Sequence, residues 1–131
     1  MEKLIVKISW SGDNYVAATG EAGGAVFATS KTLEGAKKAF ADALQFHLEG
    51  DEGDAPQWLV SGCYETEYQL EISAILHNLD GVVTRSAISR VTGINVKQIG
   101  HYAMGIRNPR PEQRKKIIEG IHRLGRELSS V

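Results

Sequence analysis

The sequence predicts an α+β fold in which a β-rich part, residues 1–71, precedes an all-helical part, residues 72–131. Before residue 71 apolar residues alternate at period two in several segments around one helical stripe, whereas after it they recur only at spacings of three and four. Charge changes sign at the same boundary. The first part carries five Lys and Arg against twelve Asp and Glu, a net charge of −7, and the second carries ten against four, a net charge of +6. We therefore expect two small domains with different partners.

The first part is expected to begin with three strands. Leu4, Val6, Ile8 and Trp10 place one continuous apolar face on a first strand. Residues 15–19 and 25–29 predict two shorter strands joined by a turn at residues 21–24. The glycines of this turn lack the lysine and the following helix of a phosphate-binding loop, so a hairpin turn is favoured.

A helix and a fourth strand complete this part. Thr32 is placed to cap a helix whose apolar stripe consists of Leu33, Ala36, Phe40, Ala43, Leu44 and Leu48. Residues 49–57 are acidic, contain glycine and resemble a linker. Residues 63–71 alternate strictly, with Tyr64, Thr66, Tyr68 and Leu70 expected on a buried side and Glu65, Glu67, Gln69 and Glu71 on an acidic side. The order βββαβ leaves at least one sheet edge exposed.

Enzymatic chemistry finds little support in this sequence. The acidic residues that could suggest a metal-dependent nuclease lie mostly in expected turns; they are Asp13, Glu21, Asp42, Asp51 and Asp54. We expect no catalytic residue, metal site or cofactor. The single Cys63 excludes an internal disulfide, and no apolar run has the length of a membrane span or of a signal-peptide core. The expected compartment is the cytoplasm.

Residues 84–109 carry the pattern of a helix-turn-helix. Thr84 can cap a first helix, Gly93 can end it with positive φ, and Asn95 can cap a second helix. Residues spaced to pack the two helices together form the expected core of the motif; they are Ala87, Ile88, Ile94, Ile99 and Tyr102. Gly105 is expected to close the second helix, and Pro111 suits the first turn of a further helix.

The outward residues of the second helix suit DNA. We assign base reading in the major groove to Val96, Lys97, Gln98 and His101, and phosphate binding to Thr84, Arg85, Arg107, Asn108 and Arg110. The alternative is that these polar residues only form the solvated face of an amphipathic helix. The net charge of +6 favours the DNA interpretation.

We expect at least a homodimer, because one helix-turn-helix of this size makes few contacts with an operator. The last helix has an apolar stripe at Ile117, Ile121, Leu124 and Leu128. This stripe or an edge of the sheet could hold the dimer, and the stripe could equally be ordinary core.

Two segments resemble a known family. The stretch TLEGAKKAFADAL at residues 32–44, followed by YETEY at residues 64–68, is similar to HicB antitoxins of type II toxin-antitoxin systems. The stretch from residue 92 to residue 128 resembles the Cro and lambda repressor-like helix-turn-helix that one branch of HicB proteins carries at its C-terminus. Residues 18–25, ATGEAGGA, replace the segment that is common after the second strand in the family.

The resemblance implies a degenerate RNase H-like domain that blocks a HicA-like mRNA-cleaving toxin, followed by a domain that represses the operon by binding operator DNA. From the charges, we assign toxin binding to Glu65 and Glu67, which no local cation obviously neutralises. The alternatives are a one-component transcription regulator whose first domain senses a small ligand and, less favoured, an active nuclease.

Overall fold

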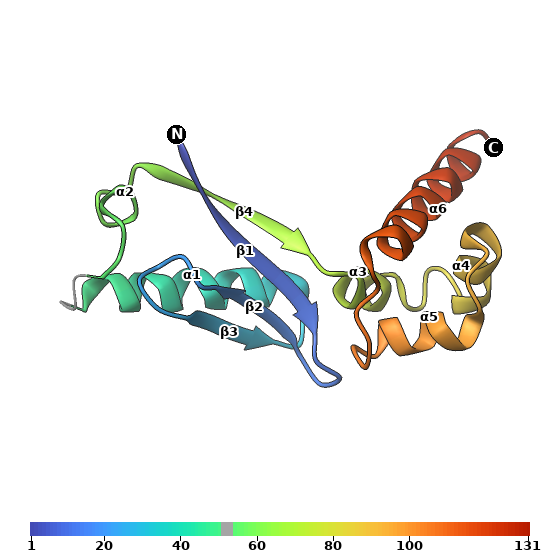
Figure 1. Ribbon diagram of the computed structural model, residues 1–131, viewed down its shortest axis with the longest axis horizontal. Helices are drawn as coiled ribbons and strands as arrows, with labels where there is room; N and C mark the ends of the chain where they lie inside the picture. Colours follow the sequence, from blue (N-terminus) through green and yellow to red (C-terminus); the bar gives the residue numbers. More distant parts are fainter. Residues whose placement is uncertain (51–53) are drawn as a thin grey trace. The chain divides into compact units, whose positions relative to one another are not determined.

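The chain forms two compact units, Met1–Glu71 and Ile72–Val131, in a computed structural model that describes residues 1–50 and 54–131. Figure 1 shows a mixed sheet and a long helix in the first unit, and helices alone in the second. This confirms the predicted α+β class and the order βββαβ of the first unit. None of the described helices is long and apolar enough to cross a membrane.

The sheet of the first unit contains β1 (Glu2–Trp10), β2 (Tyr15–Thr19), β3 (Val26–Ser30) and β4 (Tyr64–Leu70). The strand order is β3-β2-β1-β4. β1 is antiparallel to β2 and parallel to β4, so that Leu4 lies opposite Thr66 and Val6 opposite Tyr68. The parallel pair requires a crossover, which α1 (Leu33–Glu49) and α2 (Gln57–Val60) supply.

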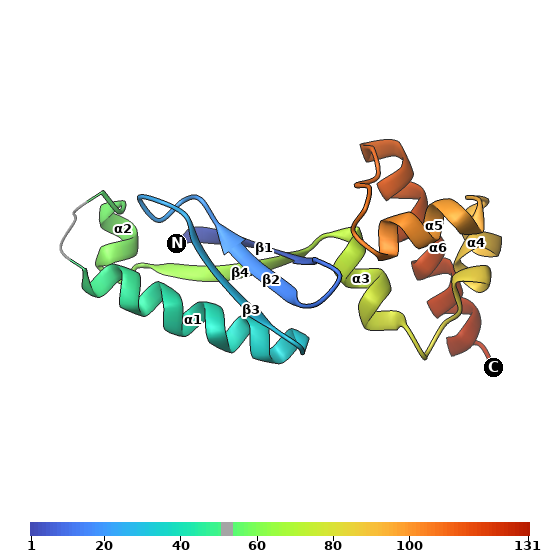
Figure 2. The same cartoon turned by 90° about the horizontal axis from the view of Figure 1, so that it is seen from below.

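α1 covers one face of this sheet (Figure 2). The helix begins where expected, because the Thr32 hydroxyl accepts the Gly35 N–H at 3.0 Å. Ala36, Phe40 and Leu44 of the predicted stripe are buried, and the facing side chains of β1 have no exposed surface. The hydrophobic core of the unit therefore lies between α1 and the two central strands.

The linker-like stretch at residues 49–57 is shorter than the sequence indicated, because its two end residues are helical. Glu49 is still helical, and Gln57 already begins α2, so this stretch connects two helices of the same unit. Residues 51–53, including the acidic Asp51, lie outside the described residues.

β4 is less buried than its alternation predicts. The four side chains expected on a buried side are only half-buried; they are Tyr64, Thr66, Tyr68 and Leu70. β4 is the outermost strand on its side of the sheet, and a single helix cannot cover four strands to the same depth. The alternation identified the correct face but could not indicate how far α1 reaches over it.

The second unit consists of α3 (Ile72–Leu79), α4 (Arg85–Thr92), α5 (Val96–Ala103) and α6 (Pro111–Ser129). Its core is formed by buried apolar residues from all four helices and the turn before α5: Ile72, Leu76, Ile88, Ile94, Ile99, Tyr102, Ala103 and Ile117. Only the first part of the predicted α6 stripe reaches this core. Ile121 and Leu124 are half-buried, and Leu128 is 64% exposed.

α6 packs closely against α4 at Gly120. A Cβ at this position would lie 2.7 Å from Thr92 Cγ2 and 3.2 Å from the Val91 carbonyl oxygen. Thr92 cannot easily rotate away, because its hydroxyl donates to the Ile88 carbonyl at 2.7 Å. The absence of a side chain at Gly120 is thus required by packing.

We expect Gly120→Ala to destabilise the second unit by about 1 to 3 kcal/mol, because overpacking outweighs alanine's higher helix propensity. Gly125→Ala is the matched control, since a Cβ there meets nothing within 4 Å on the same helix. The control should leave stability unchanged or raise it by up to about 1 kcal/mol. Urea denaturation followed by circular dichroism measures both effects, and equal responses of the two variants would contradict the close approach.

Candidate functional site

The first helix of the predicted helix-turn-helix, α4, has the expected ends. The Thr84 hydroxyl accepts the Ala87 N–H at 3.0 Å. Gly93 follows the helix with φ of 75°, a left-handed conformation that favours glycine, and its N–H donates to the Ser89 carbonyl. α4 therefore stops after two turns, and the chain reverses towards α5.

Side-chain hydrogen bonds hold the turn between the two helices. Ser89 Oγ donates to the Ile94 carbonyl at 2.5 Å, and the Ile94 N–H donates to Thr92 Oγ1 at 3.2 Å. Asn95 Oδ1 accepts the Lys97 N–H at 2.8 Å and so caps α5. Because Ile94 is also buried, the angle between α4 and α5 is set by packing as well as by hydrogen bonds.

The expected core of the motif is buried with one exception. Ile88, Ile94, Ile99 and Tyr102 belong to the core of the unit, whereas Ala87 is only half-buried. The spacing predicted the packing face of each helix, but Ala87 lies at the edge of the face on α4. The inner face of α5 is consequently packed into the core of the unit, which fixes the orientation of its outer face.

The residues assigned to base reading differ in accessibility. Val96 is 47% exposed and Lys97 is exposed, both in the first turn of α5. Gln98 is half-buried, and its Nε2 donates to Tyr102 Oη at 2.9 Å. This bond orients the amide and leaves Oε1 available as an acceptor.

His101 is less available than the sequence indicated. The ring is half-buried, and Nδ1 is buried without a hydrogen-bond partner among the described residues. The expectation of a fully outward ring was therefore wrong for this nitrogen. His101 lies near the C-terminal end of α5, where the following loop folds back so that the N–H groups of Ile106 and Arg107 donate to the His101 carbonyl.

The residues assigned to phosphate binding fall into two groups. Arg107, Asn108 and Arg110 are exposed in the loop between α5 and α6. At the start of α4, Thr84 is used as a cap, and Arg85 Nη2 lies 4.0 Å from Asp80 Oδ2. The three loop residues are thus accessible to a phosphate, whereas the Arg85 guanidinium already lies next to the Asp80 carboxylate.

Two exposed apolar side chains in the same loop were missed by the sequence reasoning. Met104 is 49% exposed and Ile106 is 61% exposed, and they flank Gly105. Gly105 adopts φ of 75°, which ends α5 as expected. The sequence carries no signal for their exposure, because an apolar residue after a helix-ending glycine frequently packs back against the last turn of the helix.

The two carboxylates assigned to toxin binding project from β4 on the face opposite the one occupied by Tyr64, Thr66 and Tyr68. Glu65 is exposed. Glu67, however, lies 3.4 Å from Lys3 Nζ and accepts from Gln69 Nε2 at 2.7 Å. The expectation that no cation neutralises the acidic side was therefore wrong for Glu67, since the parallel register with β1 places Lys3 within reach.

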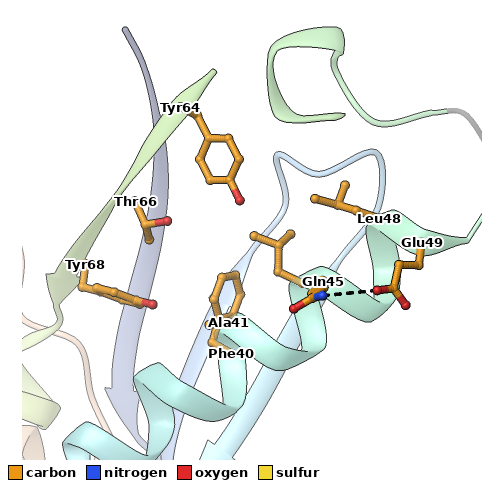
Figure 3. Close-up of a pocket in the computed structure, with 9 residues that line it drawn as sticks. Phe40, Ala41, Gln45, Leu48, Glu49, Tyr64, Thr66 and Tyr68 are labelled. Carbon is orange, nitrogen blue, oxygen red and sulfur yellow. Dashed lines mark hydrogen bonds between the residues drawn. The ribbon is translucent and has the colours of Figure 1, made fainter. Parts of the chain in front are cut away.

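A groove between α1 and β4 was also missed. It has a volume of about 460 Å³ (Figure 3). Tyr64, Thr66 and Tyr68 of β4 form one wall, and the other residues that line it come from α1: Phe40, Ala41, Leu44, Gln45, Leu48 and Glu49. Burial raises the pKa of the Tyr68 phenol, whose hydroxyl donates to the Lys37 carbonyl at 3.4 Å. The alternation of residues in β4 predicts one face of the groove, but the sequence does not indicate how far α1 lies from β4.

Groups that could bind a metal ion are absent from the described part of the chain. No cluster of three or more His, Cys, Asp or Glu side chains lies close enough together there. Comparison with protein-family models gave no match, and comparisons with curated proteins and with solved structures gave none either.

The Glu67 carboxylate should titrate below its ordinary range. The Gln69 amide lowers its pKa most, and the hydrogen bond and charge of Lys3 lower it further. We expect both Gln69→Ala and Lys3→Ala to raise this pKa, measured by NMR titration of the Glu67 side-chain carboxyl. A pKa that stays unchanged in either variant would contradict the assigned causes. Because the folded-state pKa is lowered, any stability that this site contributes is present above the unfolded-state pKa and is lost as pH falls through the folded-state value.

Proposed function

We propose that the chain is a HicB-like antitoxin that also represses its own operon in the cytoplasm. In this proposal the second unit binds operator DNA as a dimer, and the first unit binds and blocks a HicA-like mRNA-cleaving toxin. The observation that carries the DNA-binding part is the firmly capped turn between α4 and α5, which leaves the first turn of α5 exposed.

Geometry and charge support DNA binding together. Lys97 and Gln98 sit at the N-terminal end of α5, the end that a recognition helix presents to base edges. Arg107, Asn108 and Arg110 follow in the next loop, where they could contact the phosphates beside the groove. The net charge of +6 on residues 72–131 suits a polyanion.

Charge supports the toxin-binding part. A protein that cleaves mRNA requires a cationic surface for its substrate, and the first unit carries a net charge of −7. Opposite potentials accelerate association and orient the partners. Glu65 is the exposed carboxylate at the centre of this proposal, while Glu67 keeps part of its surface despite Lys3.

A dimer would double the operator contacts. The exposed end of the α6 stripe, at Leu124 and Leu128, is a candidate surface for it, because the core of the unit uses only the earlier part of the stripe.

A second candidate function is a one-component regulator that senses a small ligand. The groove between α1 and β4 favours it, because a volume of about 460 Å³ falls within the range of small-molecule sites. Ala41, Gln45 and Glu49 on its rim are exposed, however, which leaves a small molecule in contact with solvent. Mass spectrometry of the purified protein under native conditions tests this candidate.

DNA affinity should fall steeply with salt. With about four to eight phosphate contacts per dimer, the slope of log K against log salt should be about −4 to −7. Gln98→Ala should cost about 1 to 3 kcal/mol and relax the preference at one base pair, whereas Arg107→Ala should weaken all sequences equally. Binding-site selection with fluorescence anisotropy measures both.

Tyr102→Phe is the control for this experiment, because it removes the Gln98–Tyr102 hydrogen bond and keeps the amide. A slope near zero would refute DNA binding through phosphates. If Gln98 reads the base directly, Tyr102→Phe should keep the base preference and lose less affinity than Gln98→Ala, because it removes only the hydrogen bond that orients the amide.

Co-expression should reveal the toxin. The full-length chain should rescue growth from the toxin encoded beside it, and Glu65→Lys should weaken the rescue by slowing association. Glu21→Lys is the matched control, since Glu21 is an exposed carboxylate between β2 and β3 of the same unit, on the side of the sheet away from β4. Absence of any complex between the chain and its neighbouring gene product would contradict the antitoxin proposal.

A further inference from the structure

The outer edge of β4 is available for strand pairing. The Glu71 N–H, just after β4, donates to the Ile8 carbonyl at 2.7 Å. Backbone groups alternate in direction along a strand, so those of Glu65, Glu67 and Gln69 face β1, and those of Thr66 and Tyr68 face away from the sheet. Among the described strands none pairs with this edge.

The groove runs alongside the same edge. Figure 3 shows Tyr64, Thr66 and Tyr68 extending from β4 towards α1, with Leu48 and Phe40 across from them. These three residues are spaced by two, which is the side-chain period of a strand. A chain laid along β4 would therefore place every second side chain at the groove and the intervening ones on the opposite face of the sheet.

The charges around the edge are mainly acidic towards Tyr64. Glu49 is exposed on the α1 rim of the groove, where Gln45 Nε2 donates to its carboxylate at 3.3 Å, and Glu65 is exposed on the opposite face of the sheet. At the other end of the groove, Lys37 lies 5.4 Å from the centre of the Tyr68 ring and pairs with Glu34 at 3.7 Å. The Lys37 charge is thus already engaged, and Lys3 offsets Glu67 on the opposite face at 3.4 Å. Glu65 and Glu49 form no ion pair within the described part of the chain, so they are the carboxylates that suit a cation.

We propose that β4 receives a fifth strand from a basic protein partner. The added segment is extended, with apolar residues at alternate positions that enter the groove between α1 and β4. Lysine or arginine residues between them lie over Glu65. Main-chain hydrogen bonds to Thr66 and Tyr68 supply affinity, and the groove and the carboxylates supply selectivity. Only the identification of the partner as the toxin rests on the proposed function.

The test uses the full-length chain and a synthetic nine-residue peptide of alternating lysine and valine. Anisotropy of the labelled peptide measures affinity, and NMR measures amide hydrogen exchange in the ¹⁵N-labelled protein. We expect binding that slows exchange at Thr66 and Tyr68 by at least about tenfold, because their N–H groups become hydrogen-bonded. A peptide of the same composition with its lysines and valines in two blocks should bind at least about tenfold more weakly.

Thr66→Pro removes one outward N–H without removing a hydrogen bond to β1, and proline is tolerated on edge strands. The affinity of this variant for the alternating peptide should fall at least about tenfold, whereas the control Thr66→Val should bind like the original protein.

Ala41→Lys is a second variant on the exposed surface of α1 that places a cation at the groove, and Ala41→Gln is its control. Ala41→Lys should also weaken binding, while Ala41→Gln should not.

Equal binding of both peptides, unchanged binding by Thr66→Pro and Ala41→Lys, or protected amides outside β4 would each overturn the proposal. So would a small molecule that copurifies in the groove. These measurements use neither DNA nor toxin, so their failure leaves the proposed function standing. Conversely, failure of growth rescue, with the alternating peptide still bound at β4, would refute the antitoxin proposal alone.

Discussion

The left-handed turn at Gly93 is the constraint on which the candidate DNA-binding surface depends. It ends α4, and the next residue, Ile94, is buried at once in the core of the unit. Asn95 then caps the N-terminus of α5, which fixes where this helix begins. Since a single positive-φ residue is followed by a buried anchor and a cap, the outer face of α5 is oriented by backbone geometry before any ligand arrives.

That orientation also explains why the outward residues of α5 are unequal. Lys97, near the cap, is exposed. His101 lies one turn further on, is half-buried, and its carbonyl accepts from N–H groups of the following loop. Gln98 lies between these extremes, tied to the buried Tyr102 by one hydrogen bond. A hydrogen bond of this kind restricts rotamers, so the amide would lose less entropy on binding.

In the first unit, the corresponding constraint is the coverage of a four-stranded sheet by one helix. β1 is paired on both sides and buried under α1, while β4 is paired on one side only. The cost of incomplete coverage is a half-buried strand with an open edge and an adjacent groove. Natural sheets protect such edges with charge, and Glu65 and Glu67 fit that purpose. The same charges would also attract a cationic strand, so protection and recognition need not be separate properties.

The sequence by itself determined the α+β class, the order of the elements along the chain apart from α2, and the starts of α1, α4 and α5. These depend on local periodicity and on the caps Thr32, Thr84 and Asn95. It also determined which face of each element is apolar. Tertiary structure alone decided the pairing of Lys3 with Glu67, the burial of His101 Nδ1 and the groove beside β4. Each of these depends on the register or separation of segments distant in sequence, or on the path of a loop. No local pattern specifies such distances, since they result from how completely the elements pack against one another.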